Sequence, residues 1–233
     1  MLADPQRFNL YSYVRNNPLR FIDPEGEAIR LSDNEEERKK QLAALQSAVG
    51  QEAGGYLYAN KIEKKDENGN VTSTEYYVGI YENGPEGKGP AFDQINPVAG
   101  EFSPIICDTN VATISTVLPG TSIGGMVISP KGGDAAGLTA GTGTNVMIFI
   151  AFPQGPIGGK TERSQWDAVA ARKMSDGNPG YRDSGTVMAH ELGHARGRMT
   201  GDYHNGDTSD AARRLENKVR KLRDPKAATR KEH

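Results

Sequence analysis

The sequence has very little cysteine, no long apolar segment and almost no excess of charge of either sign. Cys107 is the only cysteine among 233 residues, so no disulfide can form within the chain and the fold depends on its core. The longest apolar run, VMIFIAF at 146–152, is far shorter than the about 20 residues that span a bilayer. The formal net charge of −2 gives no bulk attraction to nucleic acid or to an anionic membrane. We therefore expect neither kind of partner.

A signal peptide is also missing from the sequence. The opening residues, MLADPQRF, contain neither a basic region nor an apolar stretch. If the protein leaves its cell, we expect a larger protein to carry it. Glycine and proline, by contrast, are abundant at 28 and 13 residues, which indicates many turns and much irregular structure.

The most informative stretch is TVMAHELGHARG at 186–197, which contains the motif H-E-x-x-H. We predict a helix that begins near residue 185, on which His190 and His194 point the same way one turn apart. This separation lets both imidazoles bind one zinc ion. Glu191 projects beside the metal, where it can take a proton from the attacking water. Three of the four histidines lie within residues 190–204, which supports a metal site.

A catalytic zinc has three protein ligands and one open position, so another segment has to supply the third. The metzincin pattern would place a histidine at position 200, but the residue there is Thr200. We favour Glu216, which lies at the edge of the apolar stripe of a helix predicted at 208–223. A lone carboxylate there would be costly unless it were paired or bound to metal, and a glutamate on a second helix resembles the gluzincin plan. The alternatives are His204, Asp202 and Asp210.

The remaining pattern predicts an α+β fold, in which a small, mainly antiparallel twisted sheet packs against the motif helix and the C-terminal helix. The run NVMIFIAF at 145–152 is the clearest strand, and its continuous apolar character predicts burial on both faces. We also predict that this strand pairs with the backbone of a substrate. We also expect a helix at 33–49 capped by Asp33, and a hairpin of strands at 56–63 and 75–81 with its turn at Asn68-Gly69. Residues 84–145 should form short strands or loops (SPIICDT, VATISTVL, GGMVISP). A polar, mobile connection at 158–183 should then lead to the motif helix, capped by Ser184 or Thr186.

The stretch FNLYSYVRNNPLRFIDPEG closely resembles the segment that closes the core of Rhs/YD-repeat proteins. In that family the segment ends an encapsulating shell, and a variable toxin domain follows the D-P-x-G motif. The resemblance covers residues 3–26, and it implies that residues 1–26 are the last part of a shell and 27–233 its cargo. Glu27 stands where the family often has leucine at its self-cleavage point, so the sequence does not predict cleavage there. The family also implies a cognate immunity protein and action in the cytoplasm of a target cell.

The end of the sequence carries a second resemblance. HELGHARG followed by RRLENKVRKLRDPKAATRKEH is similar to the metallopeptidase-like toxin domains of Rhs and other polymorphic toxins. In these domains a Glu-Asn pair and a terminal Arg-x-x-His recur, and they match Glu216-Asn217 and Arg230…His233. The resemblance implies a zinc-dependent endopeptidase that cleaves a protein of the target cell, with Glu191 as general base and His233 as a donor to the oxyanion of the intermediate. The domain would comprise a helix and β-rich part at 27–160 and the two site helices at 161–233.

Two other functions compete with this one. A binding module in which zinc only closes a structural site would not need Glu191. A nuclease is a common cargo of Rhs proteins, but this chain has no basic patch and carries the metal motif of a peptidase. The sequence therefore favours a peptidase.

Overall fold

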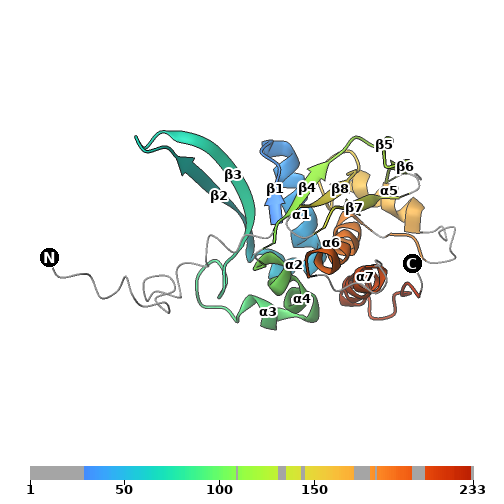
Figure 1. Cartoon of the computed structure of the whole chain (residues 1–233). Coiled ribbons are helices and arrows are strands. Elements are labelled where there is room, and N and C mark those ends of the chain that lie inside the picture. Colours follow the sequence, from blue (N-terminus) through green and yellow to red (C-terminus); the bar gives the residue numbers. More distant parts are fainter. Residues whose placement is uncertain are drawn as a thin grey trace.

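The computed structural model describes residues 29–108, 110–130, 135–142, 145–170, 179–181, 183–200 and 208–231 (Figure 1). The segment that resembles the Rhs core, 1–26, lies outside these residues. The helices are α1 (Glu35–Val49), α2 (Gln51–Gly54), α3 (Phe92–Ile95), α4 (Pro97–Ile106), α5 (Lys160–Ala170), α6 (Ser184–Thr200) and α7 (Ser209–Arg223). The strands are β1 (Ile29–Leu31), β2 (Leu57–Lys65), β3 (Val71–Ile80), β4 (Ala112–Thr116), β5 (Thr121–Ile123), β6 (Met126–Ile128), β7 (Gly137–Ala140) and β8 (Val146–Ile150).

Six of the strands form one sheet in the order β2-β3-β1-β4-β8-β7, and β5 and β6 form a separate hairpin. The pairs β1–β4 and β4–β8 are parallel, whereas β2–β3, β1–β3 and β7–β8 are antiparallel. The expected α+β class is therefore confirmed, with a mixed sheet in which antiparallel pairs are the majority.

The strand predicted to pair with substrate lies inside this sheet. β8 has β4 on one side and β7 on the other, so its backbone groups are already paired, and the prediction for NVMIFIAF at 145–152 is wrong. Among the residues that the structure describes, β7 is the edge strand at this end of the sheet. Side chains along β8 alternate between buried and half-buried, so only one of its faces packs fully into the core, contrary to the expected burial on both.

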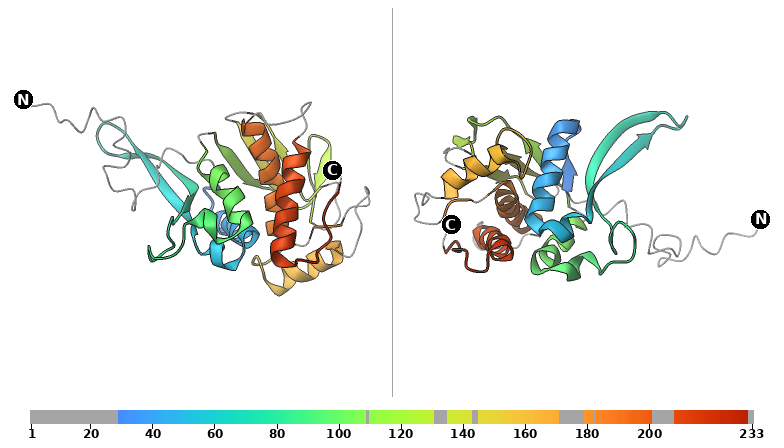
Figure 2. Two further views of the ribbon diagram at one scale, coloured as in Figure 1. Left: turned by 90° about the horizontal axis from the view of Figure 1, so that it is seen from below. Right: turned by 180° about the vertical axis from the view of Figure 1, so that it is seen from behind.

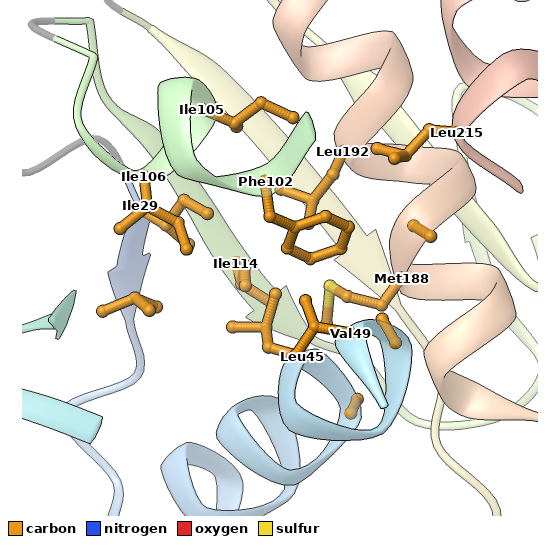
Figure 3. Close-up of a cluster of buried hydrophobic side chains, with 14 of the residues drawn as sticks. Ile29, Leu45, Val49, Phe102, Ile105, Ile106, Ile114, Met188, Leu192 and Leu215 are labelled. Atoms are coloured by element: carbon orange, nitrogen blue, oxygen red, sulfur yellow. The ribbon is translucent and has the colours of Figure 1, made fainter. Parts of the chain in front are cut away.

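The core gathers side chains from both parts of the domain (Figure 3). Phe102 of α4, Leu45 of α1 and Met188 of α6 meet over Ile29 of β1 and Ile114 of β4. All five side chains are buried. The parts at 27–160 and 161–233 therefore share one core, and α6 packs against β7 and β8, α1 and α7.

The expected hairpin is present and extends away from the body of the molecule (Figures 1 and 2). Its turn includes Asn68 and Gly69, and Gly69 has a φ of 85°, which favours glycine. The carboxylate of Asp66 accepts hydrogen bonds from the backbone N–H groups of Asn68 and Asn70 at 2.9 and 2.8 Å. Local turn chemistry thus accounts for this element.

The helices α4 and α5 lie where the sequence suggested other structure. The stretch SPIICDT begins inside α4, because Asn96 caps that helix by accepting from the N–H groups of Val98 and Ala99, and Pro97 occupies its first turn. The polar stretch at 158–183 contains α5, whose Trp166 is buried. The β-branched residues of SPIICDT favoured a strand and the polar composition of 158–183 favoured a loop. In both cases tertiary packing stabilises a helix instead.

The helix caps also differ from those predicted. Asn34, not Asp33, caps α1 by accepting from the N–H groups of Glu36 and Glu37. At α6 the cap is Asp183, whose carboxylate accepts from the N–H of Thr186 at 2.7 Å. Each true cap lies next to or near the predicted residue, so the helices begin close to where the sequence placed them.

Gly193 allows α6 and α7 to approach closely. A Cβ at this position would lie 2.4 Å from Cα of Ala212 and 2.7 Å from the backbone oxygen of Ala211. Alanine normally stabilises a helix interior relative to glycine by about 1 kcal/mol. Here we expect the opposite sign: Gly193→Ala should lower the free energy of unfolding by about 1–3 kcal/mol, because backbone atoms have to move apart.

Denaturant unfolding measures this change, and Gly55→Ala is the matched control. A Cβ on Gly55 meets nothing closer than 3.4 Å. Stabilisation by Gly193→Ala would show that the two helices do not depend on this close contact.

Glu101 of α4 joins three helices. Its carboxylate pairs with Arg196 of α6 at 2.7 Å and with Lys218 of α7. Burial acts to raise the pKa of Glu101, but Lys218 and Arg196 outweigh it and the pKa is lowered. A carboxyl whose pKa is lower in the folded state stabilises the fold above its unfolded pKa, and this contribution disappears as the pH falls through the folded pKa.

We therefore expect Glu101→Gln to reduce the free energy of unfolding at pH 7 by about 1 kcal/mol. The difference from the parent protein should shrink as the pH falls below about 4.3, the ordinary pKa of glutamate. Urea unfolding at several pH values measures it, with the exposed Glu86→Gln as control. A difference independent of pH would contradict the ion-pair explanation.

Candidate metal centre

The motif helix α6 is buried along most of its length, which fixes the direction of its side chains. His190 is buried and His194 is half-buried, and their rings meet edge to face with centroids 4.8 Å apart. Their Nε2 atoms are only 3.2 Å apart. Two nitrogens bound to one tetrahedral zinc at about 2.0–2.1 Å would be separated by about 3.3 Å, so the pair already has the spacing that a shared ion requires.

The other nitrogen of each ring contacts α7 or the N-cap residue of α7. Nδ1 of His190 lies 2.8 Å from Oε2 of Glu216, and Nδ1 of His194 lies 2.7 Å from Oγ1 of Thr208. A carboxylate only accepts, so we assign the proton of His190 to Nδ1, whereas the Thr208 hydroxyl can either donate to Nδ1 of His194 or accept from it. Nε2 of His190 then presents a lone pair to Nε2 of His194, and a cation between the two nitrogens would bind both once His194 carries its proton on Nδ1 as well.

Glu216 is the centre of a buried charge cluster. Its side chain is 0% exposed, and Arg220 and Arg230 beside it are 1% and 4% exposed. Nε of Arg220 donates to Oε1 at 2.7 Å, and Nε of Arg230 lies 3.0 Å from Oε2. Burial acts to raise the pKa of Glu216, but the hydrogen bond from His190 and the two guanidinium groups outweigh it and keep the pKa below its usual value. The carboxylate is therefore ionised, and both of its oxygens have partners.

The sequence predicted Glu216 as the third zinc ligand, and the structure places its carboxylate behind the ring of His190. Its carboxylate faces Nδ1 of His190, whereas a metal shared with His194 has to lie on the opposite side of the imidazole ring, at Nε2. Glu216 instead orients His190, as carboxylates behind metal-binding histidines commonly do. Asp210, an alternative for the third ligand, has a side chain that is 74% exposed and pairs with Arg213.

The other predicted site residues, His204, Asp202 and His233, lie outside the described residues. Within the described part of the chain, no group of three His, Cys, Asp or Glu residues is arranged to hold a metal ion. The structure thus brings together two of the three zinc ligands predicted from sequence and gives the third a different place.

Glu191 lies between α6 and β7, the edge strand. The hydroxyl of Thr139 donates to Oε2 of Glu191 at 2.7 Å. A Cβ on Gly137 would come within 2.7 Å of Cγ of Glu191, so glycine is needed for the strand to lie this close. Burial raises the pKa of Glu191, and His190 and Thr139 only partly offset the increase. A raised pKa suits a carboxyl that both accepts and returns a proton near neutral pH.

Several residues of the centre carried no signal in the sequence. Thr139 and Thr208 are single hydroxyls in unremarkable surroundings, and Tyr181, whose ring meets His190 edge-on with centroids 5.6 Å apart, belongs to no motif. Arg220 could have been found, because it follows Glu216 by four residues and such pairs meet on a helix.

Comparisons with protein-family models, with curated proteins and with solved structures found no match for this chain. Among the helices of the described residues, none has the length and apolar character to cross a membrane. The case for a function therefore depends on the chemistry of the site.

Proposed function

We propose that this protein is a zinc-dependent endopeptidase with a zincin-like site. The observation that carries the proposal is the pair of Nε2 atoms 3.2 Å apart, each on a ring whose Nδ1 already has a partner on α7. The buried carboxylate of Glu191 is the next residue after His190. A purely structural zinc site does not need such a carboxylate, whereas a hydrolytic site does.

Each residue then has a distinct task. His190 and His194 would hold a zinc ion, which would polarise a carbonyl as a Lewis acid and lower the pKa of water. Glu191 takes a proton from the attacking water and returns it to the leaving amine. Thr139 keeps the carboxylate of Glu191 turned toward β7, and we keep His233 as the proposed donor to the oxyanion.

His204 and Asp202 are the remaining candidates for the third ligand. Both follow α6 in the sequence and precede Thr208, which contacts the ring of His194. We favour His204, because a neutral imidazole completes the set of nitrogen ligands that zinc binds well.

We further propose that a substrate adds to the free edge of β7. Ala136 accepts a hydrogen bond from the backbone N–H of Ala151, so strand alternation turns the backbone groups of Gly137 and Thr139 away from β8. These two residues also adjoin Glu191. A peptide that pairs with them would pass beside the proposed general base.

Strand pairing of this kind restricts the substrate sequences that can be cleaved, and this restriction can be tested. Proline has no backbone N–H, so we expect proline to be rare within about two residues of cleavage sites. Incubation with a proteome-derived peptide library, followed by mass spectrometry of the new termini, measures the frequency. Cleavage that tolerates proline at every flanking position would contradict strand addition to β7.

The resemblance of residues 3–26 to the Rhs core supports a biological setting for this activity. We propose that the domain is the toxic cargo of an Rhs-type delivery protein. It would be carried to a target cell by that protein, act in the cytoplasm of the target cell on a protein substrate, and be neutralised in the producer by an immunity protein.

The zinc content of the purified protein tests the proposal. We expect one zinc per chain in the parent, loss of the metal in His190→Ala and in His194→Ala, and retention in Glu191→Gln. His204→Ala and Asp202→Ala, made separately, identify the third ligand by which of them loses zinc. A parent protein without zinc, even after refolding with the metal, would refute the proposal.

A further inference from the structure

The segment that follows α7, residues 224–231, runs back alongside the helix (Figure 2). The side chain of Asn217 holds it there by two hydrogen bonds to one residue. Oδ1 accepts from the backbone N–H of Arg230 at 2.7 Å, and Nδ2 donates to the backbone carbonyl of Arg230 at 2.8 Å. Ala227, in the middle of the segment, is buried. These contacts fix the point from which the Arg230 side chain leaves the backbone.

That side chain points into the molecule, behind the metal centre. Nε of Arg230 lies 3.0 Å from Oε2 of Glu216, the same oxygen that faces Nδ1 of His190 at 2.8 Å. The guanidinium carbon also lies 5.1 Å from the centroid of the Tyr181 ring, which contacts His190 by its edge. Arg230 therefore contacts two neighbours of His190, namely Glu216 and Tyr181.

Arg230 does more than balance the charge of Glu216. Arg220, one turn further along α7, already supplies one positive charge and holds the other oxygen, Oε1. A second buried guanidinium is therefore unnecessary for neutrality, and buried charges are costly to desolvate. Arg230 instead fixes the position of one oxygen of Glu216, because Arg230 is the cation that contacts Oε2, the oxygen that faces the imidazole of His190.

We propose that Arg230 is a positioning residue of the metal centre. Carried by the segment 224–231, it holds Oε2 of Glu216 against Nδ1 of His190, so that Nε2 stays directed at the metal. This inference rests on the proposed zinc site and adds to it a dependence on a segment outside both site helices.

Whether removal of Arg230 strengthens or weakens zinc binding distinguishes a positioning role from simple charge repulsion. A positive charge near a metal cation repels it, so removal of Arg230 would strengthen zinc binding if repulsion were the dominant effect. If Arg230 acts by orienting Glu216 and His190, its removal weakens binding. Loss of partners behind a metal-binding histidine typically reduces metal affinity by about 10–100-fold.

The experiment compares the zinc affinity of the full chain with those of Arg230→Met and Asn217→Ala, measured by competition with a chromogenic chelator. Arg230→Met keeps an apolar stem and removes the charge, and we expect about tenfold weaker binding. Asn217→Ala keeps the charge and releases the backbone, and we expect a change in the same direction. Lys226→Met, at an exposed position of the same segment, is the control and should stay within about twofold of the parent. Unchanged or tighter binding by Arg230→Met overturns the proposal.

A second readout does not need zinc. In the metal-free protein, the ¹⁵N shifts of the His190 ring report which nitrogen carries the proton. We expect the proton on Nδ1 in the parent and a mixture of tautomers in Arg230→Met. If the parent binds no zinc but the tautomer still changes, the positioning role stands and the proposed zinc function falls. An unchanged tautomer overturns the inference, whatever happens to zinc.

Discussion

Replacement of Glu191 by glutamine is expected to reduce peptide cleavage by a factor on the order of 10²–10⁴, the usual contribution of a general base. Zinc should remain bound, because the change leaves both imidazoles and their partners on α7 in place. Folding stability should be unchanged or slightly higher, because burial raises the pKa of this carboxyl and an uncharged amide is easier to bury. Cleavage rates on the peptide library, zinc content and urea unfolding measure the three quantities on one preparation.

The exposed Glu86→Gln is the matched control, since it makes the same chemical change far from any motif. Unchanged cleavage by Glu191→Gln, with zinc retained, would mean that Glu191 is not the general base. A parent protein that holds zinc but cleaves nothing would favour the alternative of a zinc-stabilised binding module.

Replacement of Glu216 by alanine is expected to have the largest effect on stability. It leaves Arg220 and Arg230 buried without their counter-charge, and breaking a buried pair in this way typically costs about 3–5 kcal/mol. It also removes the acceptor behind His190, which should weaken zinc binding by about 10–100-fold. Denaturant unfolding and chelator competition measure these two effects.

The same variant distinguishes the two roles considered for Glu216. If Glu216 only orients His190, zinc still reaches one per chain when the metal is in excess. If Glu216 were itself a ligand, that stoichiometry would be lost or the coordination spectrum of a cobalt-substituted protein would change. Glu216→Gln, which keeps the size and an acceptor oxygen, should lose less affinity than Glu216→Ala.

Local patterns were enough to predict the features that depend on neighbouring residues. The spacing of His190 and His194 follows from the helical repeat, and the turn at Asn68-Gly69 follows from the conformational freedom of glycine. The helix α7 was predicted from its apolar stripe. In each of these cases the information lies within a few turns of the chain.

The errors concern features that depend on distant pairing. A spacing of 22 residues between His194 and Glu216 fits a carboxylate on either side of an imidazole, and only the packing of α7 decides which nitrogen it faces. The apolar run of β8 shows that the strand is buried but not that β7 lies outside it. Thr139 and Arg230 come within reach of Glu191 and Glu216 across 52 and 14 residues of sequence, respectively, which no local pattern records.

The two histidines and the groups that contact them from behind come from successive helices, which has a consequence during protein synthesis. The two imidazoles are on α6, but their Nδ1 atoms contact Thr208 at the N-cap of α7 and Glu216 within α7, and this helix leaves the ribosome later. A nascent chain that has folded only as far as α6 would possess both histidines without an ordered place for a metal. Any zinc-dependent chemistry would therefore begin only after α7 has packed against α6. An incomplete chain that is still attached to the ribosome would have no such activity.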